Sequence, residues 1–312
     1  MAHRWLVLLL GVCGLLGGCG TLPDAKPFSD ASAALAASVV VSGHAISDSL
    51  TEAGRAVPHD AQEYKALGKE FEMAWASRIS AVQAAVTYSE SIADLIGAGN
   101  QGAETVGKVA DSLQALAAGV NIPMAAPAVG MAGDIVKLVY ARIAIVRASD
   151  KLESALAQAQ PTVSRVADHV VSESEQQLKP ILLNVYKNIQ SGIRDTYGAD
   201  DNFALQARRL RDAQRQKALQ DSTALGKLQE YDRVQETVAA SLETRDRKLD
   251  QAAAAYKTRL QLVNALSAAT LAWAQAHRDL ATAVREKRKV SVGELQNTIV
   301  ELKALAKKVS EL

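Results

Sequence analysis

Residues 201–286 read DNFALQARRLRDAQRQKALQDSTALGKLQEYDRVQETVAASLETRDRKLDQAAAAYKTRLQLVNALSAATLAWAQAHRDLATAVRE, a stretch without proline and with a single glycine, Gly226. As one continuous helix this stretch would span about 129 Å at 1.5 Å per residue. Apolar residues recur within it at every seventh position, with two more offset by four: Leu242, Leu249, Tyr256, Val263, Ala253 and Leu260. Such a heptad is typical of helices that pack along their length. The stretch therefore predicts long helices with coiled-coil character.

A second heptad pattern follows near the C-terminus. Ser291-Val-Gly-Glu294 matches a capping box, in which the serine and glutamate side chains each accept a backbone amide of the other. Apolar residues then step by three and four: Val292, Leu295, Ile299, Leu302, Ala306 and Val309. We predict two packing surfaces: this seam (residues 292–309) and the heptads of residues 242–263. Packing within the chain is favoured over packing against a second subunit.

The front of the chain has the same helical spacing. Ser29 and Asp30 are good N-caps for a helix that runs to about residue 57, ahead of Pro58. A second helix is predicted over residues 60–96, and no segment of the chain shows a convincing alternating strand pattern. We therefore expect an all-α fold, an elongated antiparallel bundle of long helices with coiled-coil character.

Proline and glycine mark the expected breaks in the middle of the chain. A helix is predicted from about residue 131 to residue 160, followed by Pro161 and Pro180, which remove amide donors and interrupt or kink helices. Helix then resumes to about Tyr197. Gly198 is expected to end it, because glycine favours the position just past a helix C-terminus.

Composition and charge agree with a packed-helix architecture. The chain is 48% hydrophobic but only 4% aromatic, and its formal net charge is +1. Without Arg4 of the leader the chain is neutral, which argues against a general nucleic-acid binder. Residues 20–150 carry 9 basic and 14 acidic side chains, whereas residues 201–312 carry 20 and 14. The first segment is therefore acidic and the second basic. We expect the two to attract each other across an antiparallel bundle, and we favour this interpretation over a basic surface that binds a ligand.

The N-terminus has the features of a secretion signal. Residues 1–19 read MAHRWLVLLLGVCGLLGGC, with Arg4 ahead of an apolar segment too short to remain as a membrane-spanning helix. Leu16-Gly17-Gly18-Cys19 resembles a bacterial lipobox. This resemblance implies cleavage ahead of Cys19 and acylation of its sulfur and its new amine. The alternatives are an ordinary signal peptide with an incidental cysteine, or Cys13 as the lipid acceptor, although the bulky Val12 precedes it.

The resemblance to bacterial lipoproteins also implies a location. Residue 20 is glycine rather than aspartate, which in lipoproteins of this kind implies sorting to the outer membrane, facing the periplasm. Several acyl chains together hold a protein on a membrane essentially permanently. We expect a leader over residues 1–18, a lipidated tether over residues 19–28 and a helical bundle over residues 29–312. With Cys13 removed and Cys19 acylated, disulfides and thiol chemistry are excluded.

Motifs that carry chemistry are weak. Gly97-Ala-Gly99-Asn-Gln-Gly102 matches a dinucleotide-binding pattern, but a helical segment precedes it and no acid lies about twenty residues further on. His44 and Asp48 lie one helical turn apart without a third metal ligand nearby in the sequence. We predict that the basic runs at residues 208–217 and 285–289 are exposed to solvent or lie at a helix C-terminus. The alternative is that they contact anionic lipid headgroups. We therefore expect no enzyme activity, cofactor or metal.

An apolar Gly/Pro-containing hairpin is predicted at about residues 96–134. Within it, residues 112–133 (SLQALAAGVNIPMAAPAVGMAG) carry no charge. One interpretation is a packed connection between helices, which leaves a structural or docking lipoprotein with protein partners in the cell envelope. The other is a membrane-active element over residues 112–146, a plan that resembles the helical pore-forming toxins of the haemolysin E kind.

Overall fold

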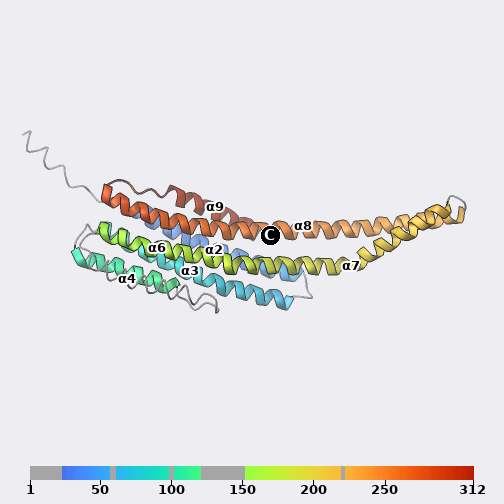
Figure 1. Cartoon of the computed structure of the whole chain (residues 1–312), viewed down its shortest axis with the longest axis horizontal. Helices are drawn as coiled ribbons and strands as arrows, with labels where there is room; N and C mark the ends of the chain where they lie inside the picture. The colour runs from blue at the N-terminus through green and yellow to red at the C-terminus, as the bar shows by residue number, and fades with distance from the viewer. Residues whose placement is uncertain (1–22, 57–60, 98–101, 121–151, 219–221) are drawn as a thin grey trace, which may run out of the picture. The chain divides into compact units, whose positions relative to one another are not determined.

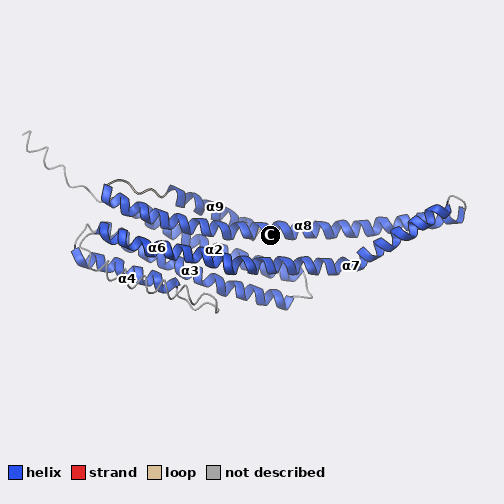
Figure 2. Ribbon diagram, viewed as in Figure 1, coloured by secondary structure: helices blue, strands red, loops and turns tan. Residues whose placement is uncertain are grey.

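The computed structural model describes residues 23–56, 61–97, 102–120, 152–218 and 222–312 (Figure 1). These residues form long helices and contain no strand (Figure 2), so the predicted all-α fold is confirmed. The helices, in chain order, are α2 (Lys26–Ala56), α3 (Ala61–Gly97), α4 (Gly102–Val120), α6 (Leu152–Glu173), the π-helical turn η3 (Ser174–Leu178), α7 (Lys179–Ala218), α8 (Ser222–Glu286) and α9 (Gly293–Ser310).

The chain divides into two compact units, and each is described by itself. Unit 1 comprises Met1–Ala37, Ser77–Val170 and Ala269–Ile299. Unit 2 comprises Ser38–Ala76, Val171–Ala268 and Val300–Leu312. Helices α2, α3, α6, α8 and α9 therefore each contribute residues to both units.

Aromatic side chains from two helices meet in the core of unit 1. The ring of Phe28 in α2 stacks on the indole of Trp273 in α8, with the ring centroids 6.3 Å apart. The indole N–H of Trp273 donates to the hydroxyl of Ser32 at 3.0 Å, and the hydroxyl of Ser89 in α3 donates to it at 2.8 Å. The two aromatic rings are thus buried where α2, α3 and α8 meet, and the indole N–H and the serine hydroxyls beside them are hydrogen-bonded.

Helices α7 and α8 pair antiparallel within unit 2. Near the start of α7, the ring of Tyr186 stacks on Tyr256, with the centroids 4.8 Å apart. Further along α7, Asp201 forms an ion pair with Arg245 of α8. Near the end of α7, Arg211 meets Asp232 at 2.7 Å. Residues later in α7 therefore contact residues earlier in α8, and Tyr256 of the predicted heptad packs within the chain.

The structure divides residues 201–286 between two helices, and the expected helix end at Gly198 is wrong. Residues 201–286 do not form one helix, because α7 ends at Ala218 and α8 begins at Ser222. Gly198 does not end a helix, because α7 continues through it. A glycine inside a helix costs only about 1 kcal/mol relative to alanine. The contacts of Tyr186 and Asp201 with α8, on either side of Gly198, are sufficient to offset that cost.

The helix boundaries around three other positions differ from expectation. Helix α2 begins at Lys26 rather than Ser29, because a carboxylate oxygen of Asp24 accepts the backbone N–H of Lys26 at 2.8 Å. Pro161 lies inside α6, which continues without interruption. Pro180 is the second residue of α7, two positions after the end of η3. The π-helical turn thus ends two residues before a proline, which lacks an amide donor.

The link from α8 to α9 is held by Asp279 rather than by the predicted capping box. Helix α9 begins at Gly293, and the backbone N–H of Ser291 donates to Asp279 at 2.6 Å instead of to Glu294. Arg288 also pairs with Asp279 and, together with the Ser291 amide, lowers the pKa of that carboxyl. The seam of α9 is buried along its whole length: Val292, Leu295, Ile299, Leu302, Ala306 and Val309. The expected packing within the chain is confirmed for this seam.

Lys287 gives the first testable consequence of the fold. It directly follows α8 with a φ of 53°, and the N–H of Arg288 donates to the carbonyl of Ala283 at 3.1 Å, as in a Schellman motif. A side chain in this conformation is strained, whereas glycine is not. Lys287→Gly should therefore raise the free energy of unfolding by about 0.5–1 kcal/mol, measured by urea denaturation. Lys289→Gly removes the same charge without this relief, so an equal gain there would contradict the explanation.

Candidate functional site

Cys19 lies outside the described residues, and the structure begins four positions later at Pro23. From there the chain enters unit 1 directly. Ala25 and Phe28 are both buried, with exposures of 2% and 0%. An extended chain reaches at most about 3.6 Å per residue, so Cys19 lies within roughly 15 Å of Pro23. Only three residues therefore separate the cysteine from the described chain, which enters a packed helix at Lys26.

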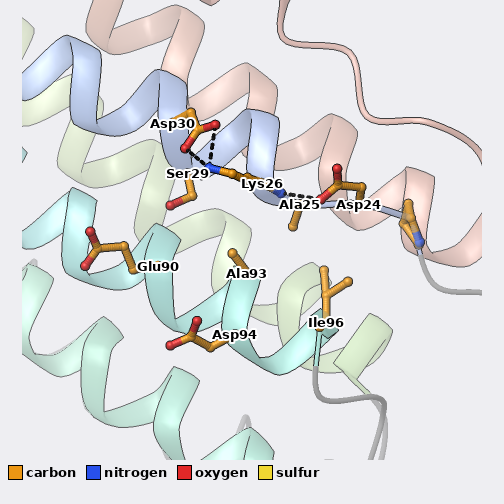
Figure 3. Close-up of a pocket in the computed structure, with 11 residues that line it drawn as sticks. Asp24, Ala25, Lys26, Ser29, Asp30, Glu90, Ala93, Asp94 and Ile96 are labelled. Atoms are coloured by element: carbon orange, nitrogen blue, oxygen red, sulfur yellow. Dashed lines mark hydrogen bonds and ion pairs between the residues drawn. The ribbon is translucent and has the colours of Figure 1, made fainter.

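An acidic depression lies beside this entry to unit 1 (Figure 3). It has a volume of about 470 Å³ and lies between the start of α2 and the end of α3. Lys26 is engaged by Asp30, whose two carboxylate oxygens lie 2.6 and 2.8 Å from the ammonium nitrogen. Asp24, Glu90 and Asp94 also line the depression, which gives it a negative balance. Among the described residues, no group of three or more potential ligands could hold a metal ion.

The two weak motifs found in the sequence do not assemble into sites in the described part of the chain. His44 and Asp48 are both exposed on α2, and no third ligand joins them there. Gly97 ends α3 and Gly102 begins α4, while residues 98–101 lie outside the described residues. The element before this glycine run is thus a helix, whereas a dinucleotide-binding loop follows a buried strand.

A buried polar chain in unit 1 was not found by sequence reasoning. The Nδ1 of His277 lies 2.7 Å from the side-chain oxygen of Gln160, and its Nε2 lies 2.7 Å from the hydroxyl of Tyr88. The Gln160 amide donates in turn to the carbonyl of Ala274 at 3.1 Å. The Gln160 oxygen can only accept, so Nδ1 carries the proton and Nε2 accepts from Tyr88. Each member of the chain is therefore satisfied with a neutral imidazole.

Burial decides what this chain of hydrogen bonds can do. Tyr88 and His277 are both 0% exposed. Desolvation lowers the pKa of His277 to about 3 and raises that of Tyr88. Because solvent does not reach these atoms, the arrangement is a structural network rather than an acid–base site. A signal for it was present in the sequence, since His277 follows Trp273 by four residues and precedes Leu280 by three on one apolar helix face.

The later part of α7 and the earlier part of α8 in unit 2, here called the arm (residues 199–218 and 222–241), expose several large apolar side chains. Phe203, Leu205 and Leu210 of α7 are 50%, 51% and 53% exposed. A groove of about 280 Å³, here called the arm groove, lies between the two helices. It is lined by Phe203, Gln206, Ala207, Leu210, Lys227, Glu230, Tyr231 and Val234. Leu205 is not among its lining residues.

The arm also carries the first basic run predicted from the sequence. Arg211 pairs with Asp232, whereas Arg208, Arg209, Arg215 and Lys217 are exposed and make no ion pair with another described residue. In the second basic run, Arg288 pairs with Asp279 and Glu286. The first run is therefore a mostly unpaired cationic surface next to exposed apolar side chains, while the second is tied into the end of α8.

The predicted apolar hairpin is only partly described. Leu113 and Leu116 of α4 are 0% exposed, and the hydroxyl of Ser112 donates to that of Ser91 at 2.6 Å. Residues 121–146, which hold the remainder of the predicted hairpin and of the predicted membrane-active element, lie outside the described residues. No helix of the described residues is both long and apolar enough to cross a membrane.

Comparisons with known proteins identify no relative of this chain. No family model matches its sequence, and no curated protein or solved structure matches it either.

Proposed function

We propose that this protein is a lipid-anchored structural or docking lipoprotein of the bacterial outer membrane, and that it is not an enzyme. The observation that carries the proposal is the lipobox Leu16-Gly17-Gly18-Cys19 at the end of a short apolar leader. Gly20 favours the outer membrane, with the helical body facing the periplasm. Acyl chains at Cys19 would hold the protein on the membrane, and its helices would present surfaces to partners in the envelope.

The short tether and the helical body support this function. Only residues 20–22 separate Cys19 from Pro23, so the acyl chains would sit close to unit 1. The protein would therefore be held close to the membrane surface rather than at the end of a long linker. The long α7–α8 pair of unit 2 offers extended helical surface, which suits a spacer or docking subunit.

The proposal predicts a large effect of one cysteine. Cys19→Ser should abolish incorporation of labelled palmitate and should release the protein from the outer-membrane fraction of a density gradient. Acylation needs the thiol, and a single amine cannot carry the multiple chains that stable anchoring requires. Cys13→Ser is the matched control, because this residue lies in the leader and should leave labelling and fractionation unchanged.

Two outcomes would contradict the proposal. Labelling that persists in Cys19→Ser but disappears in Cys13→Ser would move the acceptor to the other cysteine. A wild-type chain that is secreted, cleaved and unlabelled would identify an ordinary signal peptide. In both cases the lipobox at residues 16–19 would lose its role.

A further inference from the structure

We propose that the arm groove is a docking site for an amphipathic helix of another protein, with apolar residues at three–four spacing and acidic flanks. The groove is formed by Phe203, Ala207 and Leu210 of α7 and by Tyr231 and Val234 of α8. This inference deepens the docking role proposed above and rests on it for the place where the partner is met.

The spacing of the lining residues is that of a coiled coil. On α7, Phe203, Ala207 and Leu210 step by four and three, and Lys227, Tyr231 and Val234 do the same on α8. In coiled coils, residues at this spacing form the holes that receive the knobs of a neighbouring helix. Two antiparallel helices that line one groove with this spacing can therefore take a third helix along it, which is a common mode of peptide recognition.

The exposed fractions show that contact between α7 and α8 does not bury all the apolar residues that line the arm groove. Ala207 is 3% exposed and Val238 is 8% exposed, so the line of contact between α7 and α8 is closed. Phe203 and Leu210 line the groove yet remain 50% and 53% exposed. An exposed aromatic ring and an exposed leucine two helical turns apart on one face offer apolar surface that a partner helix can bury.

Charge decides which kind of helix fits. Lys227 lines the groove, and Lys217 continues the Phe203–Leu210 face because it follows Leu210 by seven residues. Neither Lys227 nor Lys217 makes an ion pair with another described residue, and Glu230 is the one acid among the residues that line the groove.

A positive rim favours acidic flanks on the incoming helix. Complementary charges steer the encounter and fix the register, whereas like charges placed together oppose association. A second copy of the arm would bring the same cations against this rim. The charge therefore favours a different chain, with glutamate or aspartate beside its apolar stripe, over a second copy.

A pair of designed peptides tests the proposal on the full chain purified in detergent. Both are labelled four-heptad helices with leucine at the three–four positions, and they differ only in carrying glutamate or lysine at the flanking positions. The glutamate peptide should bind at least about tenfold more tightly in a fluorescence-anisotropy titration. Its affinity should fall as salt is raised, because the rim charges are exposed.

Two substitutions of matched type and exposure locate the binding surface. Leu210→Glu places a carboxylate inside the groove and should weaken binding of the glutamate peptide by more than about tenfold. Leu205→Glu is the control. Leu205 is 51% exposed on the same helix but does not line the groove, so binding there should stay within about twofold. Both variants add the same charge at an exposed site, so folding and general repulsion are matched.

Several results would overturn the proposal. Equal loss of binding in both variants, equal binding of the two peptides, or no binding by either peptide would exclude a groove specific for an acidic helix. A dimer in sedimentation that Leu210→Glu dissociates would identify a second copy as the occupant. Binding of the Cys19→Ser chain to phosphatidylglycerol vesicles that only Leu210→Glu abolishes would identify a lipid surface. The anchor is tested separately, because its failure appears in fractionation and not in peptide titration.

Discussion

Gly43→Ala should destabilise unit 2 by about 3 kcal/mol, although alanine is the better helix former. A Cβ atom on residue 43 of α2 would lie 2.2 Å from both Cδ1 and Nε1 of the Trp75 indole. The indole cannot move away cheaply, because its N–H donates to the carbonyl of Val39 at 2.9 Å and its ring stacks on Phe71 with the centroids 5.3 Å apart. Trp75 itself is 2% exposed.

The measurement is urea denaturation of the full chain followed by far-UV circular dichroism. Gly198→Ala is the matched control in the same unit, because a Cβ at that position of α7 has no atom within 4 Å. That control should gain up to about 1 kcal/mol from helix propensity. If Gly43→Ala also gained stability, the close contact between Trp75 and residue 43 would be wrong.

Acid should destabilise unit 1 through His277. Burial lowers the pKa of this histidine to about 3 in the folded chain, against 6.5 in the unfolded chain. Between these values the unfolded chain binds the additional proton, so stability is present above pH 6.5 and is lost as pH falls toward 3. The loss approaches about 1.4 kcal/mol per pH unit, or roughly 2–3 kcal/mol between pH 6 and pH 4.

A comparison of the wild type with His277→Gln isolates the contribution of His277 to the pH dependence of stability. His277→Gln should lower stability at pH 7, because the hydrogen bonds with Tyr88 and Gln160 are disturbed. It should nevertheless flatten the dependence of the unfolding free energy on pH between 6 and 4. Asp279, whose pKa is lowered mainly by Arg288, also loses stabilisation in acid, but equally in the wild type and the variant.

His44→Gln is the control for the histidine effect. His44 is exposed on α2 and belongs to unit 2, so its replacement should leave the wild-type slope in place. Urea denaturation at each pH gives the free energies of unfolding. A slope that is the same for the wild type and His277→Gln would mean that the imidazole is not buried in its neutral form.

The all-α fold could be read from the sequence because helices are specified locally. Each helical hydrogen bond joins residues four apart, and the apolar face of a helix repeats every three or four residues. The seam of Leu295, Ile299 and Leu302 was therefore visible as a pattern and is buried in the structure. The lipobox at residues 16–19 is also a local signal, and it remains a prediction because those residues lie outside the described part of the chain.

Helix ends were predicted less well, because they depend on groups from elsewhere. Gly198 carries a local signal for a stop, yet α7 continues because its flanking residues are held against α8. The amide of Ser291 is bound by Asp279, twelve residues earlier in α8, rather than by Glu294 of the local capping box. Only the packing of one segment on another determines which of two competing partners such a group takes.

The candidate functional features likewise divide into those that the local sequence specifies and those that depend on packing between helices. The sequence by itself determined the long helices, the α9 seam, the basic run at residues 208–217 and the predicted acylation of Cys19, because each is set by residues near one another in the chain. Only the tertiary structure decided that His277 is buried between Tyr88 and Gln160, and that Phe203 and Tyr231 line one groove. Burial and groove formation depend on which helix faces meet, and that choice is made by packing over the whole unit rather than by any one segment.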